Sequence, residues 1–174
     1  MADTFLYFAY GSNMLSRRLK ARNRTPSARF IGTGFVEGHR LTFDKVSKDR
    51  AGNRSGKCNI EATTNPADRV YGVLFNIPTA EETALDDAEG LGRGYRKDKV
   101  RVLVPDGACA AVAYIADNTD PLLLPYDWYK AFVIAGAVEH ALPEAYVQRL
   151  QAVVSQPDPD PVRRAKNEAV LSES

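Results

Sequence analysis

The stretch from residue 6 to residue 15 constrains the fold most, because an apolar run stops abruptly at small polar residues and a helical pattern follows. Its aromatic residues favour a strand, and Gly11 permits a backbone angle that other residues resist. Ser12 or Asn13 can cap a short helix that carries Leu15. The pattern therefore predicts a strand, a tight loop and a helix start in immediate succession.

A turn of this kind leaves backbone N–H groups without partners at the start of the helix. Free N–H groups there form a site for a carboxylate or for an oxyanion that develops during a reaction. The same residue types also suit an ordinary strand-to-helix turn. The candidate binding residues in this loop are Tyr10, Gly11, Ser12, Asn13, Met14 and Leu15.

Strand patterns dominate the first two thirds of the chain. The apolar run at 70–75 is continuous enough for a central strand, and Asp106-Gly107 marks a hairpin turn. Residues 45–57 are rich in Gly, Asn, Ser and charged residues, which suits an exposed loop over a site. After the first strand we expect strands at 30–35, 39–44, 59–63, 69–77, 100–104 and 110–115, with 59–63 and 69–77 forming a pair.

Three further helices are predicted. Thr79 and Glu82 form a capping box at the start of the first, which ends at Gly90. The second covers about 127–140, and the third follows Leu142-Pro143 with apolar residues between 146 and 154. The alternating Pro and Asp residues after Gln156 cannot continue a helix.

The pattern as a whole predicts a single α+β domain over residues 1–155. We expect its strands to curl into a small mixed β-barrel of about six to seven strands, with helices around it. The charged residues of 156–174 would bury little, so we expect them to form a peripheral C-terminal tail.

Composition argues against a strongly charged partner. The chain has 23 basic and 22 acidic residues, so its net charge is only +1, which disfavours nucleic acid or an anionic membrane. The basic run between Arg17 and Arg24 spreads around a helix, as expected for a solvated face. No basic-then-apolar leader or apolar run of about 20 residues occurs, so we expect a cytoplasmic protein. Self-association into a homodimer stays open.

The residues that commonly carry metals or nucleophilic catalysis are sparse. Cys58 and Cys109 lie far apart, and His39 and His140 are the only histidines. This pattern favours reduced thiols and gives little support to a metal, a cofactor or a Ser-His triad. Ser12 does not lie in a Gly-x-Ser-x-Gly elbow, so a nucleophilic role for it is a minor alternative.

Glu89 is the candidate catalytic group. It lies at the end of the helix that starts near Thr79, where the helix dipole is negative, and Asp86 precedes it by three residues. Both effects oppose ionisation, which suits a general base near neutral pH if the carboxylate lines a cleft. The alternative is an exposed glutamate at a solvated acidic helix end.

The string Phe-Ala-Tyr-Gly-Ser-Asn-Met-Leu at 8–15 resembles the substrate loop of the γ-glutamylcyclotransferase family, with its Tyr-Gly-Ser-Asn motif. The string Leu-Asp-Asp-Ala-Glu-Gly at 85–90 is similar to the acidic segment of that family, in which the last glutamate is the catalytic base. Looser similarity extends to Tyr95 and to Pro-x-x-x-Tyr-Lys at 125–130, so it covers most of residues 5–150.

The resemblance implies a reaction in which the α-amine of a γ-glutamyl group attacks its own γ-carbonyl and releases 5-oxoproline and an amine. Glu89 would be the general acid and base, and the loop N–H groups from Gly11 to Met14 would hold a carboxylate or the oxyanion. Tyr10, Tyr95 and Tyr129 would orient the small-molecule γ-glutamyl substrate, and each also suits a core position.

Two alternatives remain at this stage. One is a related activity on γ-glutamylamines or glutathione, although those branches more often carry Thr-Leu or Ser-Leu where this chain has Ser-Asn. The other is a noncatalytic domain that binds a γ-glutamyl metabolite, and the presence of Glu89 argues against it.

Overall fold

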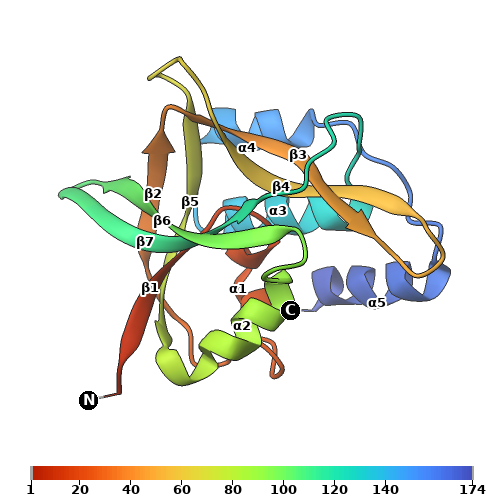
Figure 1. Ribbon diagram of the computed structural model, residues 1–174, viewed down its shortest axis with the longest axis horizontal. Helices are drawn as coiled ribbons and strands as arrows, with labels where there is room; N and C mark the ends of the chain where they lie inside the picture. The colour runs from red at the N-terminus through yellow and green to blue at the C-terminus, as the bar shows by residue number, and fades with distance from the viewer. Residues whose placement is uncertain (1, 174) are drawn as a thin grey trace.

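The computed structural model describes residues 2–173 and contains a β-barrel with helices around it (Figure 1). The strands are β1 (Thr4–Ala9), β2 (Arg29–Glu37), β3 (His39–Lys48), β4 (Arg54–Ala62), β5 (Arg69–Pro78), β6 (Tyr95–Val104) and β7 (Gly107–Ala116). The helices are η1 (Ser12–Met14), α1 (Ser16–Leu19), η2 (Thr79–Glu81), α2 (Glu82–Glu89), α3 (Asp127–Glu139), α4 (Glu144–Gln151) and α5 (Pro161–Ser172). No helix within residues 2–173 is long and apolar enough to cross a membrane.

Five of these strands close the barrel in the order β1-β5-β2-β6-β7. Its ladders are antiparallel except where β1 meets β7 in parallel at Tyr7 and Val112, so the barrel is mixed as predicted. Strand β5 lies between β1 and β2, and Val70, Val73 and Phe75 are fully buried. The fold class is confirmed, while the barrel uses five strands rather than six or seven.

The other two strands, β3 and β4, pair with each other and form a ribbon that extends from the barrel (Figure 1). The predicted exposed loop at 45–57 is therefore wrong, because both strands continue through it and only a short turn near Gly52 separates them. The predicted pairing of 59–63 with 69–77 is also wrong. Strand β5 instead pairs with β1 on one side and with β2 on the other, so its apolar run is buried more completely than it would be in a two-stranded hairpin.

The predicted side-chain caps are absent from the described helices. Neither η1 nor α1 has a side-chain cap at its start, and the Thr79–Glu82 capping box does not form because η2 precedes α2. In both places a 3-10 turn leads into the α-helix, which shifts the helix start beyond the capping residue. The predicted end at Gly90 is confirmed by its left-handed conformation, with a φ of 71°.

Helix α3 packs closely against the loop that follows β1. The contact depends on Gly136, because a Cβ atom there would lie 2.5 Å from the Leu15 nitrogen and 2.6 Å from the Met14 Cβ. Trp128 and Phe132 are buried as predicted, but Val138 is 60% exposed. Met14 and Leu15 are therefore core residues that hold the loop against α3.

The C-terminal segment contains a helix that the sequence reasoning missed. Helix α5 begins after the Pro and Asp residues, where the Asp160 side chain accepts hydrogen bonds from the N–H groups of Val162 and Arg163. None of the residues within α5 is buried. Its attachment to the domain comes from the residues at its start and from Val170 and Leu171, which are partly buried against the hydrophobic core.

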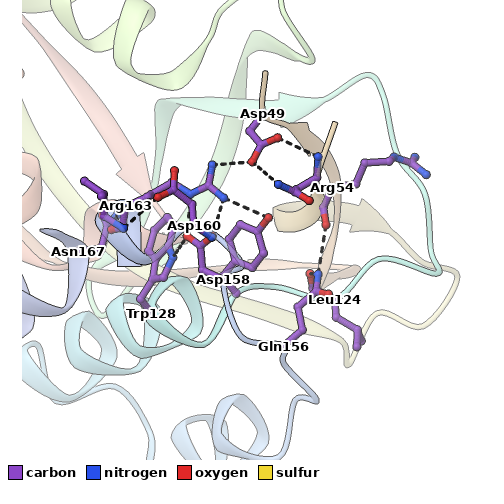
Figure 2. Close-up of polar contacts among 12 residues, drawn as sticks. Asp49, Arg54, Leu124, Trp128, Gln156, Asp158, Asp160, Arg163 and Asn167 are labelled. Carbon is purple, nitrogen blue, oxygen red and sulfur yellow. Dashed lines mark hydrogen bonds and ion pairs between the residues drawn. The ribbon is translucent and has the colours of Figure 1, made fainter. Parts of the chain in front are cut away.

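Figure 2 shows how Arg163 attaches this helix to the rest of the domain. Its guanidinium donates to both carboxylate oxygens of Asp158, at 2.7 and 2.6 Å, and to Asp49 at 3.1 Å. The indole of Trp128 also donates to Asp158, at 2.8 Å. These bonds, above all those from Arg163, hold the pKa of Asp158 at about 2, and they connect α5 to α3 and to the end of β3.

The Gly136 contact predicts a measurable loss of stability. We expect Gly136→Ala to lower the free energy of unfolding by about 1–3 kcal/mol, because the added methyl group overlaps backbone atoms that cannot easily move. Gly32→Ala is the matched control, since a Cβ atom added there would meet no atom within 4 Å, and it should change stability by less than about 0.5 kcal/mol. Equal midpoints in urea unfolding for the two variants would contradict the assigned contact.

Candidate active site

Glu89, the last residue of α2, faces a polar pocket at the loop between β1 and α1. The loop reaches this position because β1 and β7 pair beneath it, and because α3 holds it from the other side. The pocket is lined by Tyr7, Tyr10, Gly11, Ser12, Asn13, Cys58, Glu89, Tyr95, Tyr114 and Tyr129.

Most of the predicted site residues line this pocket, but two do not. Met14 and Leu15 are almost completely buried against α3 and are not among the lining residues. Tyr7, Tyr114 and Cys58 line the pocket and were missed. Tyr7 could have been found from its place in the first strand beside the motif, whereas Tyr114 lies on β7 and is brought there only by the barrel.

Asn13 connects Glu89 to a positive charge. Its side-chain nitrogen donates to Glu89 Oε1 and lies 3.2 Å from the Tyr7 hydroxyl oxygen, while its side-chain oxygen accepts from Arg24 at 3.2 Å. Both ends of the amide are thus engaged, and its orientation follows from the fixed donor at Arg24. Asn13 is only 3% exposed, so this chain of contacts holds the Glu89 carboxylate at the pocket.

Neutral tyrosines form the pocket walls. The Tyr95 hydroxyl donates to the Cys58 carbonyl at 2.6 Å, and the Tyr129 hydroxyl accepts from the Cys58 N–H at 3.0 Å. These bonds join β6 and α3 to the ribbon strand β4. Burial, more than any other cause, raises the pKa well above its ordinary value in Tyr7, Tyr10, Tyr95 and Tyr129.

The second carboxylate of α2 is already paired. Asp86 accepts from the Lys97 ammonium at 2.8 Å and from the Tyr114 hydroxyl at 2.5 Å. Asp86 is therefore not the uncompensated negative neighbour of Glu89 that the three-residue spacing suggested. It instead holds Tyr114 at the wall of the pocket.

The loop presents fewer N–H groups than predicted. The Met14 N–H donates to the Gly11 carbonyl at 3.1 Å, and the Leu15 N–H donates to the Ser12 carbonyl at 3.3 Å. The 3-10 turn thus uses one of the four expected donors, the Met14 N–H, together with the N–H of Leu15. The N–H groups of Gly11, Ser12 and Asn13 make neither of these turn bonds, and all three residues line the pocket.

The basic run is only partly a solvated face, which corrects the sequence expectation. Arg18 donates to the Ser12 hydroxyl at 3.1 Å, and its guanidinium lies 4.6 Å from the Phe132 ring centroid. Burial is the main cause that lowers the pKa of Arg18 to about 10. Arg18 and Arg24 therefore place two positive charges behind the loop.

Other groups with catalytic potential do not gather here. Within residues 2–173, no cluster of three or more His, Cys, Asp or Glu side chains is arranged to hold a metal ion. Burial raises the pKa of the Cys58 thiol to about 12, so this cysteine stays protonated near neutral pH. Glu89 is the ionisable carboxylate that lines the pocket.

Comparison with known proteins places this arrangement in a defined class. Residues 69–150, which include Glu89, match the model of the AIG2-like family. A solved structure titled gamma-glutamyl cyclotransferase superposes with a TM-score of 0.85 at 27% identity, covering 98% of this chain and 100% of the other. The small mixed barrel with its surrounding helices is thus the fold of that class of enzyme.

Two curated relatives extend the comparison to sequence. The gamma-glutamylcyclotransferase of Mus musculus is 32% identical over 160 residues, which cover 87% of this chain and 79% of the mouse protein. The gamma-glutamylcyclotransferase of Homo sapiens is 31% identical over 160 residues, which also cover 87% of this chain and 79% of the human protein. The chain belongs to the gamma-glutamylcyclotransferase family and is an enzyme of that family. The noncatalytic alternative is therefore set aside.

The Asn13 contacts predict a loss of stability that does not depend on the reaction. We expect Asn13→Ala to lower the free energy of unfolding by about 1–3 kcal/mol, because the buried groups of its partners lose their hydrogen bonds. Asn23→Ala, an exposed position between α1 and β2, should lie within about 0.5 kcal/mol of wild type. Urea unfolding of both variants checks this, and an unchanged Asn13→Ala midpoint would argue against the buried network.

Proposed function

We propose that the enzyme converts a γ-glutamyl amino acid to 5-oxoproline and releases the amino acid, with Glu89 as the general acid and base. The observation that carries this proposal is the position of Glu89 in a pocket with the Gly11–Asn13 backbone and neutral tyrosines. The family membership supports the class of reaction, and the pocket supports the assignment of roles.

The reaction needs one proton acceptor that later becomes a donor. The α-ammonium of the γ-glutamyl group must lose a proton before its nitrogen can attack the γ-carbonyl carbon. Glu89 takes that proton, a C–N bond closes the five-membered ring, and the carbonyl oxygen gains negative charge. Collapse of this intermediate breaks the original amide bond, while Glu89 returns the proton to the departing nitrogen. The ring nitrogen gives its second proton to the released amine, which leaves as an ammonium. Water is not consumed.

The loop supplies the complementary donors. The N–H groups of Gly11, Ser12 and Asn13 suit the glutamyl α-carboxylate or the developing oxyanion, and Arg18 and Arg24 add positive charge behind them. Because the reaction is intramolecular, holding the substrate in its folded, cyclising form accounts for much of the rate enhancement. The hydroxyl groups of the pocket tyrosines orient the substrate.

The nature of the leaving amine separates the proposal from its alternatives. A panel of γ-glutamyl dipeptides, γ-glutamylamines and glutathione, with 5-oxoproline as the measured product, tests all of them on one preparation. We expect the dipeptides to be the best substrates. A preference for γ-glutamylamines or glutathione would transfer the enzyme to a different branch of the family.

Glu89→Gln tests the assigned proton transfer. The amide has nearly the same shape and cannot accept the proton, so we expect the rate of 5-oxoproline formation to fall by roughly 10²- to 10⁴-fold. Glu168→Gln removes the same charge from an exposed position on α5 and should retain wild-type activity. Wild-type turnover by Glu89→Gln, at an unchanged melting temperature, would remove Glu89 from the mechanism.

We also expect activity that does not depend on a metal, a nucleotide or a cysteine nucleophile, since a carboxylate base and backbone donors can carry the proposed steps. Cyclisation should continue in a strong chelator, in a nucleotide-free preparation and after Cys109→Ser. Cys58→Ala tests the buried thiol, and the melting temperature monitors its folding. A rate that the chelator abolishes and one divalent ion restores would contradict this expectation.

A further inference from the structure

Two lysines near the pocket carry charges that the described protein does not pair. Lys45 on β3 and Lys57 on β4 are cross-strand partners in the ribbon. Lys45 is only 7% exposed, and its ammonium lies 4.7 Å from the centroid of the Tyr95 ring. Within residues 2–173, neither ammonium has a hydrogen-bond or ion-pair partner, although the charges of Glu89 and Asp117 act on Lys45 and that of Glu89 acts on Lys57.

A bound anion would make this arrangement more favourable. Like charges on directly opposed strand positions repel each other, and burial is the main cause that lowers the pKa of both lysines, although the charge of Glu89 acts in the opposite direction. Lys97 on β6 and Lys130 on α3 differ in this respect, because each ammonium donates to acceptor oxygens at 2.7 Å. The stacking of Lys45 on the Tyr95 ring offsets only part of the cost.

The lysine pair lies beside the Glu89 pocket. Tyr95, on which Lys45 stacks, lines that pocket, and so does Cys58, the residue next to Lys57. Lys57 itself lines a second cavity of about 200 Å³, with Trp128 and Arg163 among the other lining residues. Figure 2 shows Trp128 and Arg163 on either side of Asp158, which accepts from both.

The two cavities are therefore neighbours along both β4 and α3. Cys58 and Tyr129 line the first, while the preceding residues, Lys57 and Trp128, line the second. A substrate whose γ-glutamyl end occupied the first cavity could extend its leaving part toward the second. The second cavity has room for a small amino-acid side chain.

We propose that Lys45 and Lys57 bind the carboxylate of the leaving amino acid and so select γ-glutamyl amino acids over uncharged γ-glutamylamines. This inference rests on the proposed function. The carboxylate would pair the two ammonium groups and stays on the amino acid when the amide bond breaks. Lys45 and Lys57 are thus specificity residues, and they take no part in proton transfer.

A matched pair of substrates isolates this contact. γ-Glutamyl-alanine and γ-glutamyl-alaninamide differ only in the carboxylate that the lysines would bind. We expect wild type to prefer the acid in kcat/KM by roughly 10- to 100-fold, as for a hydrogen-bonded charge pair. Lys57→Met should reduce that preference at least about fivefold by lowering turnover of the acid, while turnover of the alaninamide stays unchanged.

Lys99→Met is the control for charge, because Lys99 is an exposed lysine on β6 and its loss changes the net charge equally. It should keep the wild-type preference. Equal kcat/KM values of wild type for the two substrates, or an equal loss for both in Lys57→Met, would overturn the inference while cyclotransferase activity remained. Absence of 5-oxoproline from both substrates would instead count against the proposed function.

A pH series on wild type tests the same point without a variant. Burial, assisted by the charges of Lys45 and Arg18 and opposed by Glu89, lowers the pKa of Lys57 to about 8. Lys57 is charged below this pH and neutral above it, so the preference for the acid should fall as the pH rises from 7 to 9. Glu89, Arg18, Arg24 and the cavity residues Lys48, Asp49 and Arg163 act on both substrates, and their shared effects cancel in the ratio. A constant ratio would contradict the proposed role of Lys57.

Discussion

The close approach of α3 to the loop after β1 is the contact on which the site depends. It is possible because Gly136 has no side chain, so the backbone at Met14 and Leu15 can lie directly against the helix. The same approach brings Tyr129 to the Cys58 N–H and leaves Asn13 facing Glu89. One steric constraint thus joins the barrel, the ribbon and the carboxylate.

The charged side chains around the pocket differ in whether they have an oppositely charged partner. Asp86 and Asp158 are each paired with a basic side chain, and these pairs hold Tyr114 and α5 in place. Glu89 receives an amide hydrogen bond from Asn13, while Lys45 and Lys57 form no ion pair within residues 2–173, although the charge of Glu89 acts on both. The paired charges support the structure, and the unpaired ones are those that the proposed substrate would meet.

The predictions from sequence are confirmed where the conformation of a segment depends mainly on its own residues. The Asp106-Gly107 hairpin, the end of α2 at Gly90 and the burial of β5 all follow from neighbouring residues. The segment at 45–57 failed because its polar composition suits a loop, whereas its pairing partner makes it a strand. Helix α5 was missed because its attachment depends on Arg163 reaching Asp49, a residue 114 positions away.

The sequence by itself determined the α+β class and the order of most elements, because these depend on short-range periodicity and turn chemistry. The two motifs that contain Glu89 and the Gly11–Asn13 loop were recognised from their resemblance to a known family. Only the tertiary structure decided that five strands close the barrel and that Tyr7 and Tyr114 join the pocket. It also decided that Lys45 and Lys57 lie opposite each other. Strand register and helix packing set such long-range contacts, and a linear pattern of residues does not specify which partner a strand will choose.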